Sequence, residues 1–224
     1  MPLNGLRFGF DIKDNVKPVP KALCVYPLDT LSAVEGQNRT VCFDLVKDGE
    51  FYYIPGNKRI YVWGNIGLGA EAYDYLDGSS NRCGLYELQM KVNGQLYYQH
   101  FMEGIPFDKA GYVRSHVDYA MKQKNNKSVQ KLFKDSNNKL GIYSVFENDG
   151  AITVDTDTLF TASIIMSDAY NNSSELKVKF AGKPWTRTTP AKMPENYIKT
   201  LDHSKENYFV GKDVKVKFPA YSLF

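Results

Sequence analysis

One short motif in this sequence has the residue types of a metal or acid–base site, namely His116-Val117-Asp118. On an α-helix, residues two apart point about 200° away from each other, so the two polar side chains could not share a ligand there. On a β-strand they would face the same side, but a zinc ion would still need one or two more protein ligands. We therefore interpret Ser115 to Asp118 as a capping box that starts a short helix running to about Lys122.

Acidic side chains in predicted turns are the second group that could bind a ligand. Asp74, Asp77, Glu87 and Asp168 lie in or near such turns, and oxygen-rich turns sometimes bind calcium. None of them follows the spacing of an EF-hand loop. We favour the alternative that Asp and Asn side chains close Asx-turns on backbone N–H groups. The residues expected to act structurally are Asp74, Asn81, Ser115, His116, Asp118, Asp168 and Asn172.

Histidine and cysteine are scarce, so metal or thiol chemistry has few residues to draw on. The 224 residues include three His and three Cys. No local motif supports a Cys/His nucleophile pair. An odd number of cysteines without CxxC spacing predicts ordinary, unpaired cysteines, and the alternative is one bridged pair in an oxidising compartment. We therefore predict no catalytic residue, no metal ligand and no cofactor in this chain.

The charge and the aromatic residues bear on possible partners. A net charge of +3 is too small for a dedicated nucleic-acid binder, so no nucleic acid is expected. Basic stretches at residues 114–139 and 177–199 are interpreted as solvated surface, although they could attract anionic envelope polymers. Exposed aromatic side chains could stack on sugar rings, and Trp185 and Tyr97 are the possible ligand contacts, but most aromatic residues are expected in the core.

Short β-type runs separated by turn residues dominate the chain from Ala22 onwards. Asn93-Gly94 separates two runs, at residues 86–92 and 95–101, and this is the strongest short-range pattern for a hairpin. Other runs lie at residues 22–26, 40–46, 59–63, 66–73, 159–166 and 175–180, with Gly64-Asn65 between two of them. The pattern predicts a mainly β fold, an immunoglobulin-like antiparallel β-sandwich.

Three segments are expected along the chain: a lead-in at residues 1–21, the sandwich at 22–182, and a linker with the start of a further β module at 183–224. Since an immunoglobulin-like unit needs about 100 residues, we expect a partly helical insertion at about residues 104–150. Within it, residues 141–148 could be helical or extended. Residues 213–219 alternate like a lone strand, which either joins the sandwich or belongs to an incomplete module.

Several motifs occur together in the order typical of one protein family. They lie at residues 8–15, 25–29, 70–74, 77–88, 93–94, 115–119, 138–143 and 168–174. Together they resemble the non-catalytic, β-rich region that follows the catalytic domain of bacterial lysostaphin-type (LytM-type) zinc peptidases, which cleave peptidoglycan. The resemblance covers most of residues 5 to 180, and residues 218–223 resemble the start of the next module. Asn171 stands where the family usually has glycine, and asparagine is the next-best residue for left-handed backbone.

The resemblance implies a zinc-dependent catalytic domain that is not in this sequence. The family binds zinc through His-x-x-x-Asp and His-x-His motifs, and the chain contains neither. We therefore expect a non-enzymatic accessory module that positions or shields an intramolecular catalytic domain, with Met1 as an internal start, a cloning boundary or a split gene. The alternative is an autonomous glycan-binding or peptidoglycan-binding adhesion module.

The resemblance also implies a location in the cell envelope or periplasm. The chain itself shows no export signal, because its start lacks a basic stretch followed by an apolar one. It also lacks the run of about 18 apolar residues that a transmembrane segment needs.

Overall fold

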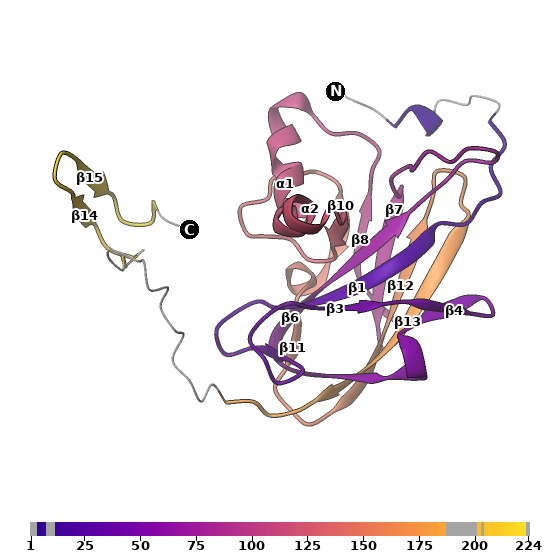
Figure 1. The fold of residues 1–224 in the computed structure, drawn as a ribbon, viewed down its shortest axis with the longest axis horizontal. Coiled ribbons are helices and arrows are strands. Elements are labelled where there is room, and N and C mark those ends of the chain that lie inside the picture. Colours follow the sequence, from indigo (N-terminus) through magenta and orange to yellow (C-terminus); the bar gives the residue numbers. More distant parts are fainter. Residues whose placement is uncertain (1–3, 8–11, 187–200, 203, 223–224) are drawn as a thin grey trace. The chain divides into compact units, whose positions relative to one another are not determined.

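The computed structural model describes residues 4–7, 12–186, 201–202 and 204–222 (Figure 1). The chain divides into two compact units, residues 1–186 and residues 187–224. Most of the predicted linker, at residues 183–194, lies outside the described residues. Among the described residues, no helix has both the length and the apolar character needed to cross a membrane.

The first unit is built on a mixed sheet of 13 strands, so the mainly β prediction is confirmed. Eight strands follow the order β10-β8-β7-β12-β13-β6-β1-β3, and the others pair along this path. The strands are β1 (Val19–Pro27), β2 (Ala33–Val34), β3 (Val41–Asp44), β4 (Val46–Asp48), β5 (Phe51–Tyr53), β6 (Arg59–Tyr73), β7 (Glu87–Val92), β8 (Gln95–Phe101), β9 (Val129–Lys131), β10 (Tyr143–Phe146), β11 (Ile152–Val154), β12 (Leu159–Ser167) and β13 (Ser173–Gly182).

The long strand β6 explains why the predicted antiparallel sheet is wrong in part. The runs before and after Gly64-Asn65 form one strand, because Gly64 adopts a φ of 75° without reversing the chain. A Cβ on Gly64 would lie 2.4 Å from Ser32 Oγ, so this glycine permits a close approach rather than a turn. The start of β6 therefore runs parallel to β13, while its later residues run antiparallel to β1.

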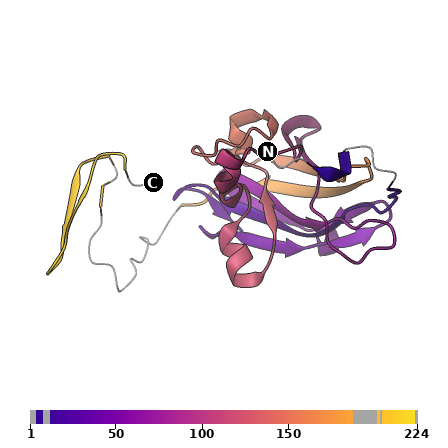
Figure 2. The ribbon, with the colours of Figure 1, turned by 90° about the horizontal axis from the view of Figure 1, so that it is seen from above.

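One hydrophobic cluster joins strands from both sides of β6. Leu23 of β1, Leu68 of β6, Met90 of β7, Ile164 of β12 and Leu176 of β13 all belong to it and are fully buried. Figure 2 shows the orange strand β13 and the indigo and purple strands β1 and β3 in different layers. Since a fully buried side chain of this size contributes about 1.5–3 kcal/mol, this cluster is the main source of stability of the unit.

The two clearest turns of the sequence form as expected. β7 and β8 pair as an antiparallel hairpin, with φ of 48° at Asn93 and 84° at Gly94. β12 and β13 pair in register from Leu159 with Ala181 to Ser167 with Ser173, and the polar residues between them form the predicted turn. Asn171 has a φ of 70° in that turn, so it adopts the left-handed backbone that glycine usually supplies.

The region expected as an insertion holds the two α-helices found among the described residues, α1 (Val113–His116) and α2 (Tyr119–Asn125). It also contributes strands β9 and β10 to the sheet. Of the stretch left open at residues 141–148, the part that forms β10 is extended and a 3-10 turn follows. The 3-10 elements are η1 (Gly5–Arg7), η2 (Pro55–Asn57), η3 (Phe107–Tyr112) and η4 (Glu147–Gly150).

The predicted capping box is wrong, although one of its residues is a cap. Ser115 lies inside α1, and its Oγ donates to the Tyr112 carbonyl at 3.2 Å. Asp118 is the N-cap of α2, where its Oδ1 accepts from the Met121 N–H at 3.0 Å. The two helices are separated because Val117 is extended, with φ −92° and ψ 144°. Since Ser115 belongs to α1 and Asp118 caps α2, the two residues cannot form a capping box at one helix start.

The second unit contains a two-stranded antiparallel sheet. The strand expected at residues 213–219 appears as β15 (Lys215–Phe218), and it pairs with β14 (Asn207–Val210). The expectation of a strand without a local partner is therefore wrong. Strand β14 supplies the backbone hydrogen-bond partners that β15 needs.

Candidate functional site

Three buried carboxylates from distant parts of the sequence meet at one end of the sheet. Asp14 precedes β1, Asp74 follows β6 and Asp168 follows β12. Each contributes one oxygen to a group in which all atoms lie within 4.8 Å of one another. The exposed fractions are 9% for Asp14 and 1% for each of the other two. We call these three residues the aspartate cluster.

The hydrogen bonds of the aspartate cluster leave two of its oxygens without a donor. Asp168 Oδ1 accepts from the backbone N–H groups of Tyr170 and Asn172, both at 2.8 Å, and its Oδ2 accepts from Asn172 Nδ2 at 2.7 Å. Asp14 Oδ1 accepts from the Val16 N–H at 3.0 Å. Among the described residues, Asp14 Oδ2 and Asp74 Oδ1 are buried and have no hydrogen-bond partner.

Burial dominates the electrostatics of the aspartate cluster. It raises the pKa of Asp74 to about 6, and the charges of Asp168 and Asp14 add to this effect, against a backbone hydrogen bond from Tyr75. Burial also raises the pKa of Asp168, although its hydrogen bonds to Asn172 and Tyr170 oppose the shift. In the part of the chain that the structure describes, no Lys or Arg forms an ion pair with any of the three. The cluster must therefore keep protons or bind a cation to balance its charge.

The same region attaches the segment before β1 to the ends of other strands. Asn172 Nδ2 donates to the Asp14 carbonyl at 3.0 Å, and Ser174 Oγ donates to the Pro18 carbonyl at 2.6 Å. Asn15 donates through its backbone and side chain to the Asp77 carboxylate, at 3.2 and 2.9 Å. Residues 14–18 are therefore held at several points, and we call them the anchored segment.

The structural residues expected in these turns thus divide into two groups. Asp74, Asp168 and Asn172 are brought together at the end of the sheet. Asn81 is exposed and does not join them; its backbone N–H donates to Ser79 Oγ at 3.1 Å within its own loop. The Asx-turn interpretation is confirmed at Asp168, whose Oδ1 accepts from two backbone N–H groups.

His116 is part of a buried polar cluster that the sequence motif did not indicate. His116 and Asp118 do not act together, since Asp118 caps α2 and bonds to Tyr26. Instead the His116 ring lies 4.6 Å from the ring of His100, edge to face, between α1 and β8. Tyr143 Oη lies 3.3 Å from His116 Nδ1, and Tyr98 Oη lies 3.1 Å from His100 Nδ1.

Both histidines are held as neutral imidazoles. Burial lowers the pKa of His116 to about 4, with nearby Gln130 opposing the shift. Burial and the neighbouring His116 lower the pKa of His100 well below its usual value. Both rings are fully buried. Neutral imidazoles without access to solvent can stabilise the packing between α1 and the sheet, but they do not face an external substrate.

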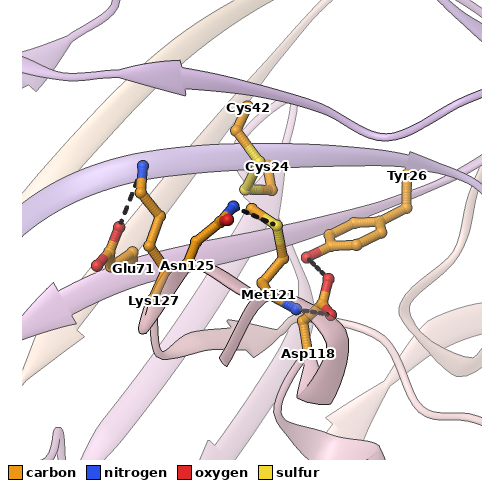
Figure 3. Close-up of a disulfide and its surroundings, with 8 residues drawn as sticks. All are labelled: Cys24, Tyr26, Cys42, Glu71, Asp118, Met121, Asn125 and Lys127. Carbon is orange, nitrogen blue, oxygen red and sulfur yellow. Dashed lines mark hydrogen bonds and ion pairs between the residues drawn. A yellow bond between two sulfur atoms is a disulfide. The ribbon is translucent and has the colours of Figure 1, made fainter. Parts of the chain in front are cut away.

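A disulfide between β1 and β3 replaces the expected unpaired cysteines, so the favoured cysteine prediction is wrong. Cys24 and Cys42 are directly opposite in the antiparallel pair, which brings their sulfurs within bonding distance. Cys83 is free. Figure 3 shows Met121 of α2 beside the disulfide. It also shows the Asp118 carboxylate, which accepts from the Met121 N–H and from the Tyr26 hydroxyl, with 2.9 Å between Tyr26 Oη and Asp118 Oδ2. The helix therefore covers the bridged strands.

The two possible ligand contacts have different environments. Tyr97 packs against the hydrophobic cluster, and its hydroxyl donates to the Ala151 carbonyl at 2.9 Å, so its ring is part of the structure. Trp185 is partly exposed and lines a pocket of about 160 Å³ together with Tyr61 and Trp63. The structure therefore brings three aromatic side chains to one pocket, and Tyr97 is not one of them.

Sequence reasoning missed Asp14 and His100 because their partners are distant in sequence. Asp14 lies 60 positions before Asp74, and no motif spacing predicts that the segment before β1 reaches that strand end. His100 and His116 belong to different elements: the pairing of β8 with β10 places Tyr143 opposite His100, and the packing of α1 brings His116 to the same tyrosine. When the chain was compared with known proteins, no family model, curated protein or solved structure gave a match.

Proposed function

We propose that this chain is a non-catalytic accessory module of a cell-envelope peptidoglycan metallopeptidase and that it positions the catalytic domain. The proposal starts from the ordered series of motifs that resembles the region after the catalytic domain of lysostaphin-type peptidases. The absence of the His-x-x-x-Asp and His-x-His motifs from the sequence supports a non-enzymatic role. The buried position of His116 also supports it, because this side chain is not presented to a polymeric substrate.

The observation that carries the positioning role is the anchored segment. By the resemblance, the residues before β1 would connect the module to the catalytic domain. Hydrogen bonds from Asn172, Ser174 and Asn15 attach this segment to the turns of the β unit. A connection held at several points restricts how a preceding domain can move, whereas a flexible linker would leave its orientation free.

We further infer an immunoglobulin-like sandwich for the first unit. The single core shared by strands from both sides of β6, which lie in different layers (Figure 2), supports this class. The parallel pairing of β13 with β5 and β6 departs from the usual antiparallel pattern of such sandwiches.

The proposed location is the cell envelope or periplasm. The Cys24–Cys42 disulfide supports it, because disulfides persist in oxidising compartments and are rare in reducing ones. Zinc would be the cofactor of the catalytic domain, and this chain would supply no ligand to it.

An assay on purified peptidoglycan tests the proposed function. The 224-residue chain, incubated with zinc, is expected to release no more peptide cross-link fragments than a buffer control, and metal analysis is expected to find no stoichiometric zinc. The physical reason is that a catalytic zinc needs about three protein ligands around an open position. Stoichiometric zinc together with cross-link cleavage would contradict the proposal.

A second candidate function, glycan binding, is favoured by the aromatic pocket of Tyr61, Trp63 and Trp185. Flat aromatic faces can stack on sugar rings. A binding assay, in which insoluble peptidoglycan is pelleted and the retained chain is measured, distinguishes the two functions. An adhesion module would be retained on the insoluble polymer in high salt and released when Trp185 is changed to Ala, whereas a positioning module would not be retained at any salt concentration.

A further inference from the structure

We propose that the aspartate cluster, formed by Asp14, Asp74 and Asp168, is a binding site for a divalent cation and that calcium is the ion it fits best. This site does not depend on the accessory role, because it rests only on side chains of this chain. It would join three segments: the one before β1, the end of β6 and the end of β12. These are the segments that the turn hydrogen bonds already bring together.

The charge of the aspartate cluster favours a bound cation. Three carboxylates that are at least nine-tenths buried lie beside one another, and none of the described Lys or Arg residues forms an ion pair with them. Like charges at this separation in a buried site repel strongly and cannot all stay ionised unless a positive charge is added. A divalent ion adds that charge at the centre of the group.

Two oxygens of the aspartate cluster lack a hydrogen-bond donor in the part of the chain that the structure describes and are therefore open to a cation. Asp74 Oδ1 and Asp14 Oδ2 are buried without a hydrogen-bond partner among the described residues. Buried polar atoms in native proteins are nearly always satisfied, and an exception calls for a bound water or ion. The Asp168 carboxylate, in contrast, is held in place by Asn172 and the turn backbone, so it is oriented before any ion binds.

The separation of the carboxylate oxygens also fits a calcium ion. Oxygen ligands at about 2.3–2.6 Å from one calcium ion are at most about 5 Å apart, on opposite sides of the ion. The three carboxylate oxygens, all within 4.8 Å of one another, meet that limit as they stand. Backbone carbonyls and water would complete the coordination shell.

The donor types favour calcium over other divalent ions. The group consists only of carboxylate oxygens, which are hard ligands, whereas zinc prefers histidine and cysteine. Magnesium demands shorter bonds, about 2.0–2.1 Å, and near-octahedral geometry, while calcium accepts irregular sites built from separate loops.

Calorimetric titration and thermal unfolding of the full 224-residue chain, freed of metal with a chelator, test the proposal. We expect one calcium ion bound per chain, at concentrations below about 1 mM, the range of extracellular calcium modules. The melting temperature is expected to rise by about 5 °C or more when calcium exceeds its dissociation constant about 100-fold. Magnesium at the same concentration is expected to give a smaller shift.

The variants Asp74→Asn and Asp157→Asn serve as a matched pair. Asp74→Asn removes a ligand charge and is expected to weaken calcium binding at least about tenfold, while raising the melting temperature in chelator because one buried charge is lost. Asp157 is exposed in the loop before β12, so Asp157→Asn is expected to bind calcium as the unmodified chain does. If circular dichroism shows that Asp74→Asn does not fold, Asp14→Asn replaces it, since an Asn Oδ1 can still accept from the Val16 N–H.

Three results would overturn the proposal. The absence of calcium binding and of a thermal shift in the unmodified chain up to about 1 mM would mean that the cluster keeps protons instead. Unchanged binding in the folded Asp74→Asn or Asp14→Asn variant would place the ion elsewhere. An equal response to magnesium would remove the assignment to calcium.

Discussion

Replacing both Cys24 and Cys42 with alanine is expected to lower the free energy of unfolding by about 3 kcal/mol. The bridge spans 18 positions, and a loop of about this length restricts the unfolded chain by that amount. For a protein of this size the melting temperature is expected to fall by about 6–12 °C. Thermal unfolding followed by circular dichroism, without reducing agent, measures the change.

The free cysteine supplies the control for this prediction. Cys83 is only partly buried and unbridged, so Cys83→Ala is expected to lower the melting temperature far less than the double variant. A reducing agent is expected to destabilise the unmodified chain and Cys83→Ala alike, but not the double variant. Equal melting temperatures for the oxidised chain and the double variant would show that the Cys24–Cys42 bridge does not form.

Acidification from pH 7 to pH 4 is expected to cost roughly 3 kcal/mol of stability through His116 alone. Its pKa is about 4 in the folded protein, below the usual value near 6.5 that applies when the chain unfolds. Above pH 6.5 the imidazole is neutral in both states and has no effect. Between pH 6.5 and 4 the unfolded chain binds a proton that the folded protein does not, so stability falls as the pH falls.

The groups around His116 set the design of this test. Lys131 disfavours a charge on the buried His116 ring, while Gln130 and Asp135 favour one, and the Tyr143 hydroxyl lies 3.3 Å from its Nδ1. His116 in turn helps to lower the pKa of His100. Asp74 changes the stability in the opposite direction to His116. Because its pKa is raised in the folded protein, the folded state binds a proton before the unfolded chain does, and stability rises as the pH falls.

Comparison of the unmodified chain with His116→Asn isolates the histidine contribution. An asparagine amide can occupy the place of Nδ1 but does not titrate in this range. Urea unfolding at several pH values is expected to show a shallower loss of stability between pH 6.5 and 4 in the variant, with the carboxylate contributions cancelling. Equal pH dependence in the two proteins would contradict the buried, neutral state of His116.

The local part of this fold is predictable from the sequence. The Asn93-Gly94 hairpin and the β12–β13 turn form where local turn chemistry places them, because both depend on residues that tolerate positive φ. The error at Gly64 has the same origin. A glycine that permits a close contact with Ser32 looks in sequence like a glycine that makes a turn, and the difference decides whether β6 is one strand or two.

The long-range part of the candidate site is not predictable in this way. Asp74 and Asp168 are recognisable as turn residues, but Asp14 joins them only because hydrogen bonds hold the segment before β1 against the turns that contain Asn172 and Asp77. The pairing of Cys24 with Cys42 likewise depends on the register of β1 with β3. The first contact depends on hydrogen bonds between turns and the second on strand pairing, and a single sequence carries no spacing rule for either.

Amide hydrogen exchange of the anchored segment tests the central claim most directly. Residues 14–18, which precede β1, are fixed to the β unit by hydrogen bonds. The N–H groups of Asn15 and Val16, which donate to Asp77 and Asp14, are expected to exchange at least about tenfold more slowly than in an unstructured peptide.

The same measurement on two asparagine variants gives the decisive comparison. Asn172→Ala removes the bond to the Asp14 carbonyl and is expected to speed exchange at Val16, whereas Asn125→Ala, at the exposed end of α2, is expected to leave it unchanged. Exchange of both amides at the rate of an unstructured peptide would contradict the account, because the segment could then not position a preceding domain.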